Sequence, residues 1–218
     1  MLKKILLGVA VVLVALCGVI ATRPSTFSVQ RTATLKASPD IAFALVNDFQ
    51  HWGEWSPWDK MDPNQKRTFE GAATGVGSIY GWSGNDQVGE GRMTIEESKA
   101  NELIRIKLEF IKPFATTNST TFTFSPVAEG TSVTWKMEGQ NDFMGKAFSL
   151  FMDMDAMVGK DFDNGLATLG KVAEAEARKR AEAEAARLVA EAAAAAAAPA
   201  APVEGQPATG QTVTAPTP

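Results

Sequence analysis

The chain has very few of the residues that build metal sites and covalent frameworks. Its 218 residues include one cysteine, Cys17, and one histidine, His51. A single cysteine excludes an intramolecular disulfide framework and a thiolate zinc cluster, and a single histidine excludes a multi-histidine metal site. The sequence therefore predicts no metal and no cofactor. It also lacks an excess of positive charge, since its net charge is -4, and this argues against nucleic-acid binding.

Apolar residues make up 45% of the chain, an ordinary share for a soluble protein, but they are distributed very unevenly. All the tryptophans and phenylalanines and the single tyrosine fall in the middle of the sequence. We expect four parts: an N-terminal transmembrane anchor or signal peptide (1–23), a globular domain (24–172), an Ala/Glu-rich helical extension (173–198) and a disordered Pro/Ala-rich tail (199–218).

The N-terminal part has the composition of a membrane segment. Lys3 and Lys4 precede an uncharged run of Leu, Val, Ile and Ala at 5–21, which is just long enough to cross a bilayer as a helix. We expect it to be an uncleaved anchor, with a cleaved signal peptide and a lipoprotein signal using Cys17 as alternatives. The basic residues before the run outnumber Arg23 after it. This predicts a cytoplasmic N-terminus and a domain outside the cytoplasmic (inner) membrane.

The middle part alternates between apolar and polar residues in several segments. In residues 103–110, Ile, Leu and Phe alternate with Arg, Lys and Glu, as in a strand with one face in the core. From Asp142, a candidate helix cap, apolar residues recur every three or four positions and predict one long helix that covers the apolar face of the sheet. The expected antiparallel strands are 27–37, 77–83, 90–98, 103–110, 117–125 and 131–138.

A series of short motifs carries a family resemblance. These are Ser38-Pro39-Asp40, Trp55-Ser56-Pro57-Trp58, Gly75-Val76-Gly77-Ser78 before Trp82, Gly89-Glu90-Gly91 before Ile95, Gly130-Thr131-Ser132-Val133-Thr134-Trp135, and Asp161-Phe162 with Gly165-Leu166. In this order they resemble the SRPBCC (START/Bet v 1-like) superfamily, specifically bacterial polyketide cyclase/dehydrase and lipid-transport-like domains. The resemblance covers about residues 27–172.

The resemblance implies an α+β helix-grip fold, in which a curved antiparallel β-sheet surrounds a long C-terminal α-helix. In this chain an N-terminal transmembrane helix would precede that fold. Members of the superfamily bind hydrophobic ligands such as lipids, sterols or polyketides in a cavity between sheet and helix, and a minority are enzymes. No residue set in this sequence can be carried over as a catalytic site.

The cavity candidates come from three groups of side chains. Tryptophans suit a cavity rim or a plug for the end of the core, and methionines suit irregular pockets or plain core. Arg31 is expected on the inward face of the first strand, where it would anchor a ligand carboxylate or phosphate, or form an ion pair at the sheet edge. His51 is expected to be an ordinary surface residue. The candidates are Trp55, Trp58, Trp82, Phe110, Phe124, Trp135, Met137, Phe151, Met154, Met157 and Arg31.

The leading functional hypothesis is a membrane-anchored binding module for a small hydrophobic or lipid-like ligand, held to the membrane through residues 5–21. One alternative is a polyketide cyclase/dehydrase-like enzyme, which would need convergent polar groups near Arg31 or His51. Another is an envelope interaction protein that uses the C-terminal arm. The sequence identifies no protein partner.

Overall fold

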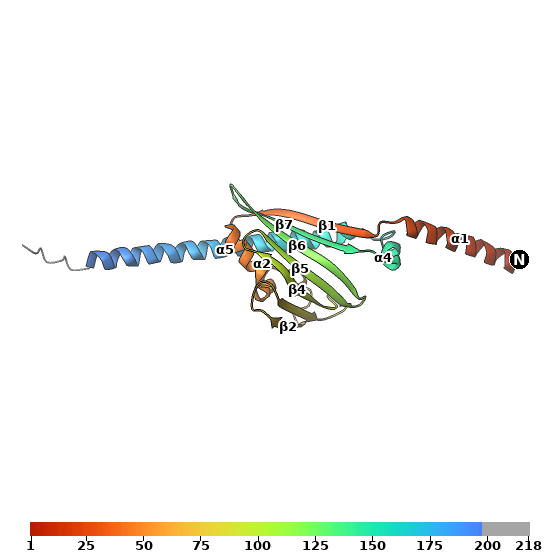
Figure 1. Ribbon diagram of the computed structural model, residues 1–218, viewed down its shortest axis with the longest axis horizontal. Helices are drawn as coiled ribbons and strands as arrows, with labels where there is room; N and C mark the ends of the chain where they lie inside the picture. Colours follow the sequence, from red (N-terminus) through yellow and green to blue (C-terminus); the bar gives the residue numbers. More distant parts are fainter. Residues whose placement is uncertain (198–218) are drawn as a thin grey trace, which may run out of the picture. The chain divides into compact units, whose positions relative to one another are not determined.

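The computed structural model describes residues 1–197 and has the helix-grip fold (Figure 1). Seven antiparallel strands form one sheet in the order β1-β7-β6-β5-β4-β3-β2. Strands β2 to β7 therefore follow one another as a meander, and β1 closes the other edge against β7. The strands are β1 (Thr26–Leu35), β2 (Lys66–Gly71), β3 (Ser78–Ser83), β4 (Glu90–Lys99), β5 (Leu103–Lys112), β6 (Thr116–Val127) and β7 (Gly130–Gln140).

Six strands were expected from the sequence, and each is confirmed to within two residues at either end. The edge strand β2 was missed. All of its residues are exposed, so it has no alternation of apolar and polar positions to reveal it. It is held by its backbone pairing with β3.

The helices occupy three places along the chain. One precedes the sheet, a group of short ones lies between β1 and β2, and two follow β7. They are α1 (Leu2–Thr22), α2 (Pro39–Asn47), the 3₁₀ helix η1 (Phe49–His51), α3 (Trp52–Trp55), the 3₁₀ helix η2 (Trp58–Lys60), α4 (Phe143–Phe148) and α5 (Met154–Ala197).

The prediction of a single helix starting at Asp142 is wrong, because the chain forms two helices there. Asp142 does cap α4, since its Oδ1 accepts a hydrogen bond from the Gly145 backbone N–H at 2.7 Å. A second carboxylate, Asp153, accepts from the backbone N–H groups of Asp155 (3.0 Å) and Ala156 (3.2 Å) and so starts α5 afresh. The apolar residues before that cap are thereby separated from the stripe that enters the core.

Helix α5 closes the concave face of the sheet. Phe162, Leu166, Leu169 and Ala173 are each at most 1% exposed. Ala173 was assigned to the extension, yet it belongs to the core, and the partly buried Ala177 also packs against it. Sheet residues that meet the helices in this core include Val29, Leu35, Ile95, Ile104, Ile106, Phe122, Val133 and Trp135.

The chain divides into two compact units, residues 1–179 and 180–218. In the second unit, the described residues 180–197 are helical and exposed up to residue 196, and Arg187 pairs there with Glu184 (2.7 Å) and Glu191 (3.5 Å). The predicted tail at 199–218 lies outside the described residues.

Helix α1 is long and apolar enough to cross a membrane, with a mean hydropathy of 2.9. A signal sequence would have the same length and composition. Three residues, Arg23 to Ser25, connect it to β1.

The close approach of α5 to the sheet depends on Gly165. A Cβ at this position would lie 2.8 Å from Cζ3 of Trp135 and 3.2 Å from Cδ of Pro57. We predict that Gly165→Ala lowers the free energy of unfolding by about 1–3 kcal/mol, the usual cost of overpacking, although alanine is the better helix former. Denaturant titration of the full-length protein in detergent measures this change.

Gly170→Ala is the matched control on the same helix. Its Cβ would meet Cγ of Leu35 at 3.7 Å, an ordinary contact. This variant should gain up to about 1 kcal/mol from helix propensity alone. Equal stabilisation by both substitutions would contradict the close packing at Gly165.

Candidate ligand-binding pocket

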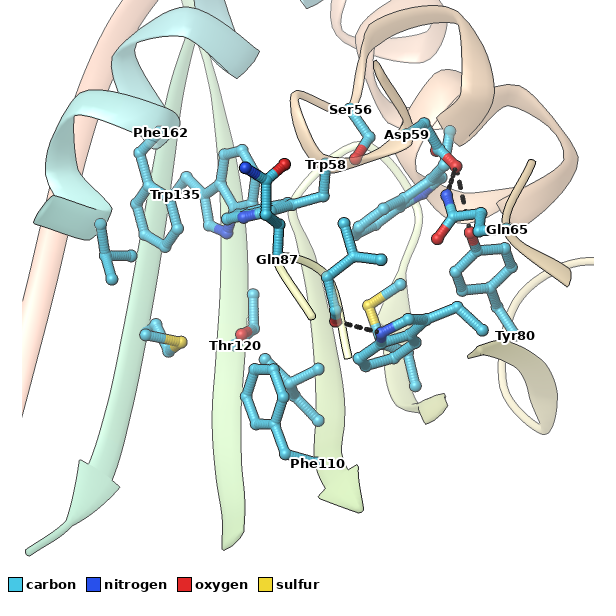
Figure 2. A pocket seen from close by; sticks show the side chains of 17 residues that line it. Ser56, Trp58, Asp59, Gln65, Tyr80, Gln87, Phe110, Thr120, Trp135 and Phe162 are labelled. Carbon is cyan, nitrogen blue, oxygen red and sulfur yellow. Dashed lines mark hydrogen bonds between the residues drawn. The ribbon is translucent and has the colours of Figure 1, made fainter. Parts of the chain in front are cut away.

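A pocket of about 190 Å³ lies between the sheet and the first turns of α5. Side chains of β3 to β7 line it on the sheet side, and Phe162 of α5 lies on another side (Figure 2). Val158 of α5 also belongs to the lining. Residues from α3 to η2, Gln65 before β2, and residues from the turn before β4 complete it. The lining residues are Trp52, Ser56, Trp58, Asp59, Gln65, Tyr80, Trp82, Gln87, Val88, Met93, Leu108, Phe110, Thr120, Trp135, Met137, Val158 and Phe162.

Aromatic rings make most of the wall on the α5 side. Trp135 stacks on Phe162 with centroids 4.1 Å apart and planes within 8°. Trp58 meets the Trp135 ring edge-on at 5.6 Å. On the other side, Trp82 and Phe110 pack edge-to-face at 5.8 Å. Aromatic faces and edges favour a flat apolar ligand in the space between them.

One indole donor in this wall has no partner. The Nε1 groups of Trp52 and Trp82 donate to the carbonyls of Val46 (3.0 Å) and Val88 (2.9 Å). Trp135 is 2% exposed, and its Nε1 makes no hydrogen bond within residues 1–197. A buried donor without a partner costs about 1–3 kcal/mol, and a hydrogen-bond acceptor placed beside Nε1 would remove that cost.

A polar corner, formed by Asp59, Gln65, Arg67 and Tyr80, interrupts the apolar lining. Oδ1 of Asp59 accepts hydrogen bonds from Nε2 of Gln65 (2.6 Å) and the hydroxyl of Tyr80 (3.2 Å), as Figure 2 shows. Nε of Arg67 lies 2.9 Å from the same oxygen and neutralises the carboxylate, which is 7% exposed. Arg67 itself is outside the lining.

Tyr80 is a neutral hydrogen-bond donor in this corner. Burial raises the pKa of its hydroxyl above the usual range, and the negative charge of Asp59 raises that pKa further. Arg67 opposes this effect only in part. The corner therefore presents an ion pair and a protonated phenol to the pocket.

The structure brings five of the candidate residues together around the pocket: Trp58, Trp82, Phe110, Trp135 and Met137. Two others are core residues outside the lining. Trp55 is fully buried and donates from Nε1 to the carbonyl of Leu45, and Phe124 packs edge-on against Phe43 at 5.5 Å. Trp55 fits the alternative in which tryptophans plug the end of the core.

Three candidates from the predicted long helix are outside the pocket. Phe151 is 85% exposed, and Met154 and Met157 are about half exposed. The expectation that they line the cavity is corrected, because the chain breaks before Met154 and turns these side chains out of the core. Val158 and Phe162, further along α5, take the place foreseen for them.

Arg31 lies on the inward face of β1, as expected, but forms ion pairs at the sheet edge. Its Nη1 lies 2.9 Å from Oδ1 of Asp155 and its Nε 3.3 Å from Oδ2 of Asp163, both on α5. The hydrogen bonds from Arg31 lower the pKa of the Asp155 carboxyl. Arg31 therefore ties α5 to β1 and does not line the pocket.

His51 also lies away from the pocket, on the surface, where Nδ1 is 2.7 Å from Oε1 of Glu54. Within residues 1–197, no three His, Cys, Asp or Glu side chains gather as a metal ion would need. The groups considered from the sequence for catalysis, Arg31 and His51, are thus outside the pocket lining.

Several lining residues were missed. Met93, Leu108 and Thr120 occupy inward positions of their strands, so the alternation in the sequence was a sufficient signal for them. The polar corner had no such signal. It joins η2, the segment before β2, and strands β2 and β3, whose contacts exist only in the folded chain.

The sequence matches the family described as polyketide cyclase/dehydrase and lipid transport over residues 26–174. The chain belongs to this family. The match spans the whole sheet and α5 up to residue 174. Among curated proteins, none matches the chain.

Solved structures share the fold of this family member. A protein of unknown function from Staphylococcus aureus is 13% identical with a TM-score of 0.54, covering 72% of this chain and 99% of that one. The KanY protein is 17% identical with a TM-score of 0.51, covering 69% and 99%. A protein from Mesorhizobium loti is 15% identical with a TM-score of 0.50, covering 68% and 97%. At these identities the likeness concerns the fold alone.

Tyr80 is the chain's single tyrosine, so its titration can be followed directly by tyrosinate absorbance. We predict that the native protein shows no tyrosinate near pH 10, where an unfolded tyrosine has its pKa of about 10. Because folding raises this pKa, the contribution of Tyr80 to the free energy of unfolding is fully present below about pH 10. The stabilisation is lost as the pH rises above it.

Asp59→Asn tests whether the negative charge of Asp59 raises the pKa of Tyr80. Removing the negative charge should move the Tyr80 titration to lower pH while burial still holds it above that of the denatured protein. If Tyr80 titrated at the same pH in the native and in the denatured protein, its burial in the polar corner would be contradicted.

Proposed function

We propose that this protein is a membrane-anchored binding module for a small, compact hydrophobic molecule. The observation that supports it most is the aromatic-lined pocket between the sheet and α5. Family membership supports a ligand-binding domain, and α1 supports the anchor.

The size of the pocket favours a compact ligand. An engineered apolar cavity of about 150 Å³ binds benzene, and pockets for drug-sized ligands are about 300–1,000 Å³. At about 190 Å³, this pocket suits a molecule of one or two rings. A two-chain lipid would need the sheet and α5 to move apart.

The polar groups favour a ligand with at least one hydrogen-bond acceptor. The unpartnered Nε1 of Trp135 would bond to a carbonyl or ether oxygen after a small turn of the ring. The polar corner carries a carboxylate already neutralised by Arg67, so it favours a neutral ligand over an anion. The preferred class is therefore a neutral aromatic or alicyclic compound with one oxygen acceptor.

A pocket-filling variant tests the binding site. We predict that Val158→Phe, on the wall of the pocket, weakens binding of one- and two-ring aromatic ketones by about tenfold or more, equal to about 1.4 kcal/mol. Calorimetric titration of the full-length protein in detergent measures the affinities. Val172→Phe is the matched control, since Val172 is a partly buried valine of the same helix and lies outside the pocket. It should bind as the wild type does.

Absence of binding by the wild type across such a panel, with no apolar compound in organic extracts of the purified protein, would overturn the ligand-binding proposal. If Val158→Phe and Val172→Phe bound the compounds with equal affinity, the binding site would lie outside this pocket.

The anchor is tested on the mature chain. We predict that protein extracted from native membranes keeps Met1 or Leu2 at its N-terminus and stays with the membrane at alkaline pH. Intact-mass spectrometry gives the terminus. A chain that starts after residue 21 would identify a cleaved signal, and one that starts at a lipidated Cys17 would identify a lipoprotein.

An enzymatic function has less support. It would need convergent polar groups in the pocket near Arg31 or His51, and both residues are outside the pocket lining. The polar corner is the remaining candidate for acid–base chemistry, and Oδ1 of Asp59 already accepts hydrogen bonds from Gln65 and Tyr80 and forms an ion pair with Arg67. These bonds suit ligand positioning better than proton transfer.

A further inference from the structure

A group of exposed apolar side chains lies on α4, on the segment after it, and on the β5–β6 turn. Phe151 is 85% exposed and Phe114 is 71% exposed. Phe114 contacts Phe148 across the two elements, with ring centroids 6.3 Å apart. Neighbouring large apolar residues on a protein surface usually mark an interface. We call this group the α4 patch; it consists of Phe114, Phe143, Met144, Phe148, Phe151 and Met152.

The α4 patch is next to the point where the chain leaves α1. Nη2 of Arg23, the residue after α1, donates to the carbonyl of Ser149 at 3.0 Å. The backbone N–H of Asn141, just before α4, donates to the carbonyl of Ser25 at 2.8 Å. Helices α1 and α4 are in contact, and Figure 1 shows α4 beside the end of α1. A membrane spanned by α1 would therefore have its surface close to α4.

The charges around the patch favour insertion among lipids over attraction to their headgroups. Lys146 is the only charged residue from 143 to 152, and Asp142 and Asp153 flank that stretch. Helices that bind anionic membranes carry several basic residues on their polar face, and this segment does not. Its affinity for a bilayer would come from burying phenylalanine and methionine side chains.

We propose that the α4 patch inserts into the interfacial layer of the same bilayer that α1 spans, and so holds the domain in one orientation on the membrane. This inference rests on the membrane anchoring proposed above. It would place the pocket close to the lipid, because Val158 in the pocket wall follows Met152 of the patch by six residues, and Phe110 of the lining precedes the turn that carries Phe114. A hydrophobic ligand dissolved in the bilayer would then have a short route to the pocket.

Site-specific fluorescent labelling of the full-length protein in phosphatidylcholine vesicles tests the proposal. An environment-sensitive nitrobenzoxadiazole group is attached to Phe151→Cys, or to Met144→Cys on α4 itself, both combined with Cys17→Ala. The control is Val127→Cys in the same background. Val127 is also an exposed apolar residue, but it stands at the opposite end of β6 from Phe114. The wild type labelled at Cys17 reports separately on α1.

We expect both patch labels to emit at shorter wavelength than the control and to lose intensity when the vesicles contain a lipid-borne quencher. Patch labels that respond only to a water-soluble quencher, as the control should, would overturn the proposal. A blue shift without lipid quenching would also overturn it, since a protein or a second copy would then cover the patch. Lipid quenching at Cys17 in these cases would leave the anchor intact, whereas its absence would refute the anchor.

Discussion

The stack of Trp135 on Phe162 is the contact that sets the distance between the sheet and α5. It joins β7 to the helix at 4.1 Å between ring centroids, and Gly165 lets the helix backbone come close enough for it. The same two rings form a wall of the pocket. Because the core and the pocket share these side chains, the pocket is a continuation of the core where the helix and sheet are no longer in full contact.

Arg31 holds α5 to one edge of the sheet. Its ion pairs with Asp155 and Asp163 fasten the beginning of α5 to β1, at one edge of the sheet. The pocket floor extends from β7 to β3, away from that edge, and η2 covers its far end through Asp59. An arginine on the inward face of the first strand is thus a structural tie. It is not part of the pocket lining.

Local patterns in the sequence were sufficient for most of the fold. Alternation gave six strands, including the inward positions of Trp135 and Met137, because burial of one face imposes a period of two. The polar corner was not predictable in this way. Its ion pair joins Asp59 and Arg67 across two elements, and β2, which carries Arg67, has no buried residue. Tertiary contacts between exposed or polar residues produce no periodic hydrophobic pattern in the sequence, so they cannot be predicted from it.

The apolar stripe after Asp142 shows a different limit. A helical recurrence of Phe, Leu and Met indicates that the helix has an apolar face. The period does not show whether that face packs against a protein core or a lipid layer. Two carboxylate caps, at Asp142 and Asp153, divide the stripe. The part after the second cap enters the core at Val158 and Phe162, while the part between the caps stays exposed beside the exit of α1. Chain geometry, and not composition, therefore assigns one half of the stripe to the core and leaves the other half exposed.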